Sequence, residues 1–149
     1  MDDQIKEENL IKKALSNKTI AMIGVSAIKK EVKTNIKRRP STIVMKYMQE
    51  FGYKVIPVNP FAAGEIIHGE TVVSKLEDIS IPIDIVDVFR PSNEAPNFAK
   101  ETIKIGAKVF WLQYGIQNSD AEKIVKSKDI IYISNKCIKQ EYQKLFEKS

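Results

Sequence analysis

The segment Thr19-Ile20-Ala21-Met22-Ile23-Gly24-Val25 decides the fold class of this chain. It is almost wholly apolar and shows no alternation of apolar and polar residues. A strand with one face in water alternates, whereas a continuous apolar run is typical of a strand that is covered on both faces of a parallel sheet. The segment therefore predicts a central parallel strand.

Strand and helix patterns alternate along the rest of the chain. Apolar runs predict strands at 53–58, 83–89, 107–112 and 130–133, and a very short one at Val72-Val73. Helical spacing predicts helices at 4–15, 42–51, 74–79, 93–105 and 138–147, and another from an Asn118 or Ser119 cap to about 127. This order implies right-handed crossovers, so we expect a doubly wound, Rossmann-like parallel sheet of about five strands in one α/β domain. Residues 1–17 form an N-terminal helix in this interpretation, and residues 18–149 form the Rossmann-like domain.

Single residues mark the boundaries of these elements. Ser74 and Ser92 are the predicted N-caps of the helices that follow them, and Gly106 is predicted to end the helix over 93–105. Pro57 lies inside the second predicted strand. Because proline cannot donate a hydrogen bond to a neighbouring strand, it favours an edge strand or a strand end.

The composition excludes several classes of protein. The chain has 149 residues, of which 43% are hydrophobic and 29% charged, a balance typical of one folded domain. No apolar run approaches the roughly 20 residues of a membrane-spanning helix, and the acidic start does not resemble a signal peptide. One cysteine and one histidine allow neither an internal disulfide nor a Cys/His zinc site. We therefore expect a cytoplasmic protein without a metal.

The net charge of +5 is concentrated in one place. The segment 29–39, called the basic segment below, contains six lysines and arginines and one glutamate, and the rest of the chain is neutral. The high pI therefore reports one short segment rather than a basic protein.

Polar residues follow the predicted strands. In doubly wound sheets, ligands bind beyond the carboxyl ends of the strands, where the strand order reverses. The residues at these ends are Ser26, Asn59-Pro60, Arg90-Pro91, Gln113-Tyr114-Gly115 and Asn135-Lys136-Cys137. The basic segment begins just beyond the first strand, at the end of the sheet where nucleotide folds bind phosphate.

The nucleotide is not expected to be NAD. Gly24-x-Ser26 matches only the start of the G-x-G-x-x-G fingerprint, because residue 26 is serine and residue 29 is lysine. An NAD site also has an acidic residue after the second strand to bind the ribose hydroxyls, and Asn59-Pro60 occupies that place.

Six segments, in this order, resemble the small stand-alone CoA-binding domain family. They are 20–26, Arg39-Pro40-Ser41 with Val44 and Tyr47, 52–60, 84–90, 106–113 with Gly115-Ile116, and Cys137. The resemblance extends over about residues 18–146, and the same domain resembles the N-terminal half of the succinyl-CoA ligase alpha subunit. It implies a Rossmann-like domain that binds coenzyme A (CoA) or an acyl-CoA thioester.

The resemblance also implies which residues contact CoA. The phosphates would be bound by Arg38, Arg39 and Ser41 beside Pro40, and Gly24 would let the backbone approach them, with Ser26 as a further ligand-binding residue at the first strand end. Asn59 and Pro60 would lie against the adenine or ribose, Phe89 and Arg90 would border the pantetheine arm, and Gln113 and Cys137 would complete the site. The link over 28–38 is longer and richer in lysine than is usual for the family. This leaves open which of Lys29, Lys30, Lys33 and Lys37 face the ligand.

Other reactive side chains point to no catalytic set. Asp84 and Asp87 are three apart on a strand and face opposite sides, so they cannot be a paired acid and base; Asp87 is expected to anchor a loop or pair with a basic group. His68 is expected to be an exposed loop residue, and Trp111 and Tyr114 core or rim residues. Cys137 is either a reactive thiol, able to form a mixed disulfide with CoA, or a ligand-contacting or buried residue without chemistry.

We therefore expect a non-catalytic carrier, sensor or accessory module for CoA. Two alternatives stay open: an enzyme subunit, acting with a ligase-like partner or through Cys137, and a nucleic-acid module that uses the basic segment. A homo-oligomer is also compatible with the sequence.

Overall fold

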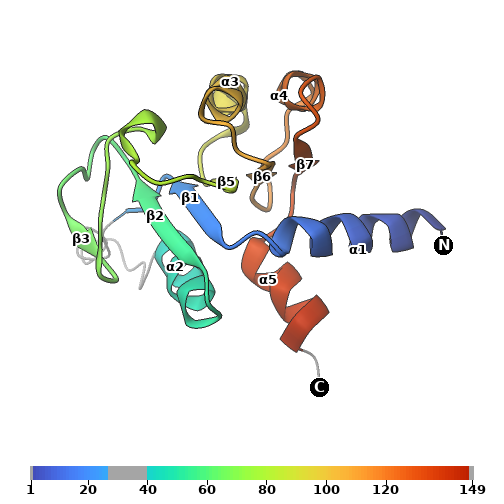
Figure 1. Cartoon of the computed structure of the whole chain (residues 1–149), viewed down its shortest axis with the longest axis horizontal. Helices are drawn as coiled ribbons and strands as arrows, with labels where there is room; N and C mark the ends of the chain where they lie inside the picture. Colours follow the sequence, from blue (N-terminus) through green and yellow to red (C-terminus); the bar gives the residue numbers. More distant parts are fainter. Residues whose placement is uncertain (1, 27–39, 148–149) are drawn as a thin grey trace.

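A five-stranded parallel sheet forms the centre of the molecule, as predicted (Figure 1). The computed structural model describes residues 2–26 and 40–147. The strand order is β2-β1-β5-β6-β7, and every neighbouring pair is parallel. The strands are β1 (Thr19–Ile23), β2 (Lys54–Val58), β5 (Ile85–Val88), β6 (Val109–Leu112) and β7 (Ile131–Ile133). The Rossmann-like α/β fold expected from the sequence is therefore confirmed.

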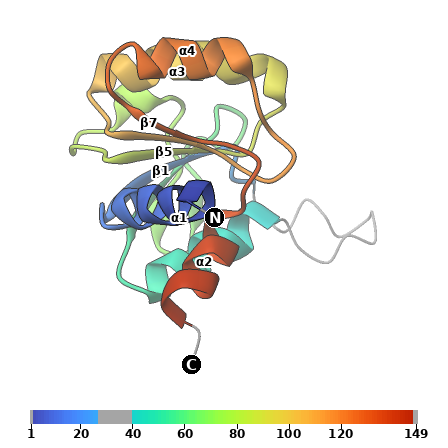
Figure 2. The same ribbon diagram turned by 90° about the vertical axis from the view of Figure 1, so that its right-hand side faces the viewer.

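Helices cover both faces of this sheet (Figures 1 and 2). One face, called the α2 face below, packs against α1 (Asp2–Leu15), α2 (Pro40–Glu50) and α5 (Ile138–Tyr142), which a π-helical turn (Gln143–Glu147) extends. The α3 face packs against α3 (Ala95–Ile105) and α4 (Ser119–Lys126). Both faces are thus buried, which explains why the strands are continuously apolar.

Alternation along each strand assigns side chains to the two faces. In β5, Ile85 belongs to the core of the α2 face, whereas Val86 and Val88 belong to the core of the α3 face. Asp87 lies between these valines, so its side chain is on the α2 face. Trp111 of β6 lies on the same face, is fully buried and donates from Nε1 to the Lys136 carbonyl at 2.8 Å.

Several predicted boundaries are confirmed. Pro57 lies in β2, which is an edge strand of the sheet. Gly106 ends α3 in the left-handed region at a φ of 76°, and Asn118 caps α4 by accepting from the Ala121 amide at 2.9 Å.

Two predicted caps are wrong. Ser74 caps no helix, since the short 3-10 helix η2 (Leu76–Asp78) begins after Lys75 without a side-chain cap. Ser92 opens a separate 3-10 turn, η3 (Ser92–Glu94), ahead of α3, and its hydroxyl accepts from the Gln117 amide at 3.1 Å instead. The very short strand predicted at Val72-Val73 is reduced to a single bridge from Val73 to Val58. A hairpin of β3 (Ile66–Ile67) and β4 (Glu70–Thr71), which was not predicted, lies just before it.

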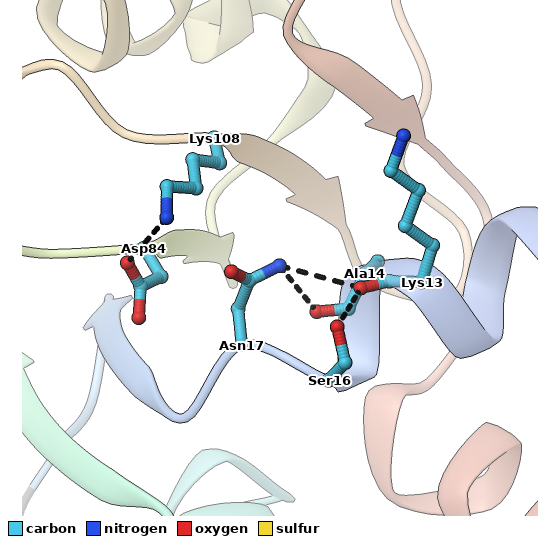
Figure 3. Close-up of polar contacts among 6 residues, drawn as sticks. All are labelled: Lys13, Ala14, Ser16, Asn17, Asp84 and Lys108. Atoms are coloured by element: carbon cyan, nitrogen blue, oxygen red, sulfur yellow. Dashed lines mark hydrogen bonds and ion pairs between the residues drawn. The ribbon is translucent and has the colours of Figure 1, made fainter.

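Several polar contacts lie near the amino ends of the strands (Figure 3). The Asn17 amide donates to the carbonyls of Lys13 and Ala14 at 3.3 and 3.2 Å and so completes the last turn of α1. Asp84, just before β5, lies 3.9 Å from the Lys108 ammonium. These contacts lie at the opposite edge from the strand ends that carry the predicted ligand residues. No helix in the described ranges is long and apolar enough to cross a bilayer.

Candidate functional site

The strand order reverses between β1 and β5, at the carboxyl edge of the sheet. From β1 the chain crosses through α2 on one face to reach β2, and from β5 it crosses through α3 on the other face to reach β6. The two crossovers leave in opposite directions, which opens a crevice at this edge. Two cavities lie there, one on each face of the sheet.

Gly24 and Phe89 join the two cavities. The Phe89 amide donates to the Ile23 carbonyl at 2.8 Å, and the Gly24 amide donates to the Val58 carbonyl at 2.8 Å. Gly24 has a φ of 96°, and a Cβ atom on it would lie 2.9 Å from the Phe89 carbonyl oxygen. Gly24 lines the cavity of the α3 face, and Phe89 lines that of the α2 face. Any larger residue at position 24 must therefore displace the strand end between them.

The α3-face cavity combines apolar walls with charged groups. Its volume is about 320 Å³. It is lined by Ile23, Gly24, Val58, Asn59, Pro60, Phe61, Ser74, Lys75, Leu76, Arg90, Glu94, Phe98 and Glu101. Burial, together with the nearby Glu77 carboxylate, raises the pKa of Glu101.

Asn59 shapes the rim of this cavity. Its Nδ2 donates to the Val25 carbonyl at 2.9 Å, and its Oδ1 accepts from the Phe61 amide at 2.9 Å. The side chain thus ties the exit of β1 to the exit of β2 and holds Pro60 at the cavity wall. Both polar side-chain atoms of Asn59 bind backbone groups of the protein, so Asn59 holds the shape of the cavity rim.

Arg90 is engaged by Glu94 rather than free. Its Nε and Nη2 donate to the two carboxylate oxygens of Glu94 at 3.0 and 2.7 Å. These hydrogen bonds lower the pKa of Glu94 and raise the pKa of Arg90. Phe89 and Arg90, which were expected to border the same part of the groove, line different cavities because successive residues of an extended chain point to opposite faces.

The described lining of the α2-face cavity has no lysine, arginine, histidine, aspartate or glutamate. Its volume is about 640 Å³, and its described lining residues are Val44, Phe89, Gln113, Tyr114, Ile116, Cys137 and Gln140. Cys137 is partly exposed and lies immediately before α5.

A buried carboxyl group lies beneath this cavity. Asp87 is fully buried, and its Oδ1 accepts a hydrogen bond from Nε2 of Gln113. Its Oδ2 is buried without a partner in the described part of the chain. Burial raises the pKa of Asp87 to about 8, although the hydrogen bond from Gln113 acts in the opposite direction. Of the two roles expected for Asp87, the described residues show no pairing with a basic group; its partner is the neutral amide of Gln113, the first residue after β6.

The remaining predicted residues are distributed as follows. Pro40 and Ser41 begin α2, and Ser41 is buried. Ser26 is the last described residue after β1, and Arg38 and Arg39, with the whole basic segment, lie outside the described residues. His68 is exposed, as expected, with Nε2 3.1 Å from the Thr42 carbonyl.

Sequence reasoning missed other lining residues. Glu94 was detectable, since it stands four residues after Arg90, the spacing of a helical ion pair. Lys75, Val44 and Gln140 carry no such signal, because only the folding of η2, α2 and α5 against the strand ends brings them to the cavities.

Comparison with known proteins identifies relatives of the whole domain. Residues 18–143 match the family model described as CoA binding domain. YneT of Bacillus subtilis strain 168, described as uncharacterized, is 40% identical over 123 residues, covering 83% of this chain and 84% of YneT. The structure of cell-free ID.343 from Thermus thermophilus superimposes with a TM-score of 0.79 at 32% identity, covering 98% of this chain and 99% of that one. A hypothetical protein from Pyrococcus horikoshii OT3 gives a TM-score of 0.79 at 33% identity, over 93% and 90% of the two chains. The chain belongs to the CoA binding domain family.

Proposed function

We propose that this protein binds CoA or an acyl-CoA, with the adenine nucleotide in the α3-face cavity and the pantetheine arm in the α2-face cavity. One observation carries the proposal: two cavities of different character meet at the Gly24–Phe89 contact, on the carboxyl edge of the sheet. CoA has the same two-part chemistry, since an anionic nucleotide is linked to a neutral arm with two amides.

The α3-face cavity suits the nucleotide. Val58, Pro60 and Phe98 provide apolar surface for an adenine ring, and Lys75 provides positive charge for a phosphate. The basic segment directly precedes α2 in the sequence, and we propose that Arg38 and Arg39 contribute further phosphate contacts. Ser41, in the first turn of α2, adds a hydroxyl near the free amides of that helix start.

A carrier or sensor role fits the side chains of the site better than catalysis. Cys137 is the only thiol of the chain, and the described residues that line its cavity include no histidine, carboxylate or lysine to act as its base. Asp87, the one buried acid beneath the cavity, is held by Gln113. These observations support binding without covalent chemistry. An acyl-CoA thioester would accordingly be held without being cleaved.

Isothermal titration calorimetry of the full chain tests the proposal. CoA and acetyl-CoA are expected to bind saturably at one site per chain, and NAD⁺ at the same concentrations is expected to give no saturable heat. Dephospho-CoA is expected to bind more weakly if a cation reads the 3′-phosphate. The absence of CoA and acetyl-CoA binding at millimolar ligand overturns the proposal. Incubation of bound acetyl-CoA, followed by mass spectrometry, is expected to recover the thioester intact.

A further inference from the structure

Among the described residues that line the α2-face cavity, Gln113 is the one buried polar side chain. It follows β6 directly and is only 4% exposed, whereas Gln140, the other amide of the cavity, is exposed on α5. The Gln113 backbone is fixed as well, because its amide donates to the Val88 carbonyl at 3.2 Å and its carbonyl accepts from the Ile116 amide at 2.9 Å. A buried amide on a rigid strand end is a well-ordered hydrogen-bonding group.

Asp87 determines how the Gln113 carboxamide is oriented. Within the side-chain carboxamide of Gln113 only Nε2 can donate, and it donates to Asp87 Oδ1. This hydrogen bond leaves the carbonyl Oε1 and the second N–H of Gln113 without a partner in the described residues. Asp87 itself is fully buried on the same face of the sheet, one strand away from Gln113. The pair therefore places one acceptor and one donor at the wall of a cavity whose other walls are largely apolar.

We propose that Gln113 recognises the amide groups of the pantetheine arm and that Asp87 is a positioning residue that fixes the Gln113 carboxamide. The inference rests on the proposed function and adds the residue that selects the arm. Each pantetheine amide carries one donor and one acceptor, which are complementary to the free Oε1 and N–H of Gln113. The side chain is already ordered, so binding it costs little rotamer entropy.

Three ligands distinguish this inference from the proposed function. CoA contains both halves, 3′-phospho-ADP contains the nucleotide without the arm, and pantetheine contains the arm alone. Calorimetry on Gln113→Met, which keeps the length of the side chain and removes its polar atoms, is expected to weaken CoA about tenfold and leave 3′-phospho-ADP unchanged. The matched control is Gln143→Met, an exposed glutamine of the π-helical turn that is not among the described lining residues of either cavity, with an expected change of less than about twofold.

The outcomes separate the two claims. If the wild-type protein binds neither CoA nor 3′-phospho-ADP, the proposed function fails. If it binds CoA no more tightly than 3′-phospho-ADP, or if Gln113→Met weakens both ligands equally, CoA binding stands and the inference about Gln113 is overturned.

Substitution of Asp87 tests its positioning role. Asp87→Asn keeps an oxygen that accepts from Gln113 Nε2, so it is expected to retain wild-type CoA affinity. Asp87→Val removes that acceptor and is expected to weaken CoA, but not 3′-phospho-ADP, about as much as Gln113→Met does. In the Gln113→Met background, Asp87→Val is expected to have no further effect on affinity, because its action passes through Gln113. Additive losses in the double variant, or a loss in Asp87→Asn equal to that in Asp87→Val, contradict the positioning role.

A folding control accompanies these measurements. Thermal unfolding monitored by circular dichroism shows whether each variant is folded at the temperature of the titration. If Asp87→Val does not fold, the comparison of Gln113→Met with Gln143→Met still decides whether Gln113 recognises the arm, and the affinity of Asp87→Asn still tests whether an acceptor oxygen at position 87 is sufficient to hold Gln113.

Discussion

The two cavities lie at one edge of the same sheet but differ in the charge of their described lining residues. The α3-face cavity has charged walls, and its Arg90 is already paired with Glu94. The described lining of the α2-face cavity has no lysine, arginine, aspartate or glutamate, and its buried amide is held by a buried acid. The difference follows from the alternation of side chains: Phe89 and Arg90 are neighbours in sequence and line opposite cavities. One strand end thus contributes a side chain to each of the two cavities.

The largest effect is expected at the point where the two cavities meet. Gly24→Ala places a Cβ atom 2.9 Å from the Phe89 carbonyl, at a φ of 96°. The strand end must shift, so we expect CoA and 3′-phospho-ADP affinity each to fall about 100-fold, or about 3 kcal/mol, with a loss of about 1–3 kcal/mol in stability. Calorimetry and urea unfolding measure the two effects.

Gly52→Ala is the matched control for this variant. Gly52 has a φ of 95°, and no atom lies within 4 Å of its virtual Cβ, so it carries the same backbone strain without the clash. It is expected to lose stability while retaining CoA affinity. Equal losses of affinity in the two variants would contradict a specific role for the Gly24–Phe89 contact.

The buried acid of the α2 face predicts a pH dependence of stability. Asp87 has a pKa near 3.8 when solvated and about 8 in the fold. Between these values the folded state keeps a proton that the unfolded state has lost, so the contribution of Asp87 is full below about pH 3.8 and is lost progressively as the pH rises to about 8. The slope is about 2.303RT per pH unit, which amounts to a loss of about 3 kcal/mol between pH 5 and 7.

Urea unfolding of the wild type and Asp87→Asn, at several pH values and constant ionic strength, measures this effect. The wild type is expected to lose stability relative to Asp87→Asn as the pH rises from 5 to 7. A constant difference between the two proteins over that range shows that Asp87 does not titrate differently in the folded and unfolded states.

The sequence predicts the sheet and the positions of the site, but not its division into two cavities. Continuous apolar runs and Pro57 are local signals, so the five strands and the edge position of β2 can be deduced from them. Gly24, Asn59 and Gln113 line a cavity because each directly follows a strand of the parallel sheet, and Cys137 lines one from the loop between β7 and α5.

The side-chain partners could not be predicted in the same way. Asp87 and Gln113 are 26 residues apart, and only the register of β5 on β6 brings them together. The cap predicted at Ser92 is wrong for a related reason. The Ser92 hydroxyl accepts from the backbone amide of Gln117, 25 residues away, rather than from an amide of its own helix. Local signals thus locate strand ends, while tertiary contacts decide what each polar group binds.

The loop between β2 and β3 provides a test that is confined to the α3-face cavity. Asn59→Ala removes the hydrogen bonds to the Val25 carbonyl and the Phe61 amide, so the rim of the cavity loses its shape. We expect about tenfold weaker binding of 3′-phospho-ADP and a loss of about 1–2 kcal/mol in stability.

The matched control lies beside the other cavity. Asn135 accepts from the Gly115 amide at 2.7 Å and has a φ of 58°, so Asn135→Gly removes the side chain without adding backbone strain. It is expected to leave 3′-phospho-ADP affinity unchanged. If both variants weaken this ligand equally, the nucleotide is not confined to the α3-face cavity.

The smallest effect is expected from the ion pair of the α3-face cavity, and it is a gain. Glu94→Gln removes the charge that holds Arg90 and leaves a single weaker acceptor in its place. Both side chains are partly exposed, so the pair contributes little to stability, and its loss is expected to cost less than about 1 kcal/mol.

In Glu94→Gln, a free Arg90 guanidinium and one negative charge fewer favour the binding of an anionic ligand. We therefore expect about threefold tighter binding of 3′-phospho-ADP and CoA alike at low ionic strength, with the gain shrinking as salt is added because the groups are screened. Pantetheine affinity is expected to stay at its wild-type value, since the arm does not reach this pair. Weaker binding of the nucleotide by Glu94→Gln would instead show that the ligand needs Arg90 held in place, and that the charged walls of this cavity act, like the Asp87–Gln113 pair, as a prearranged unit.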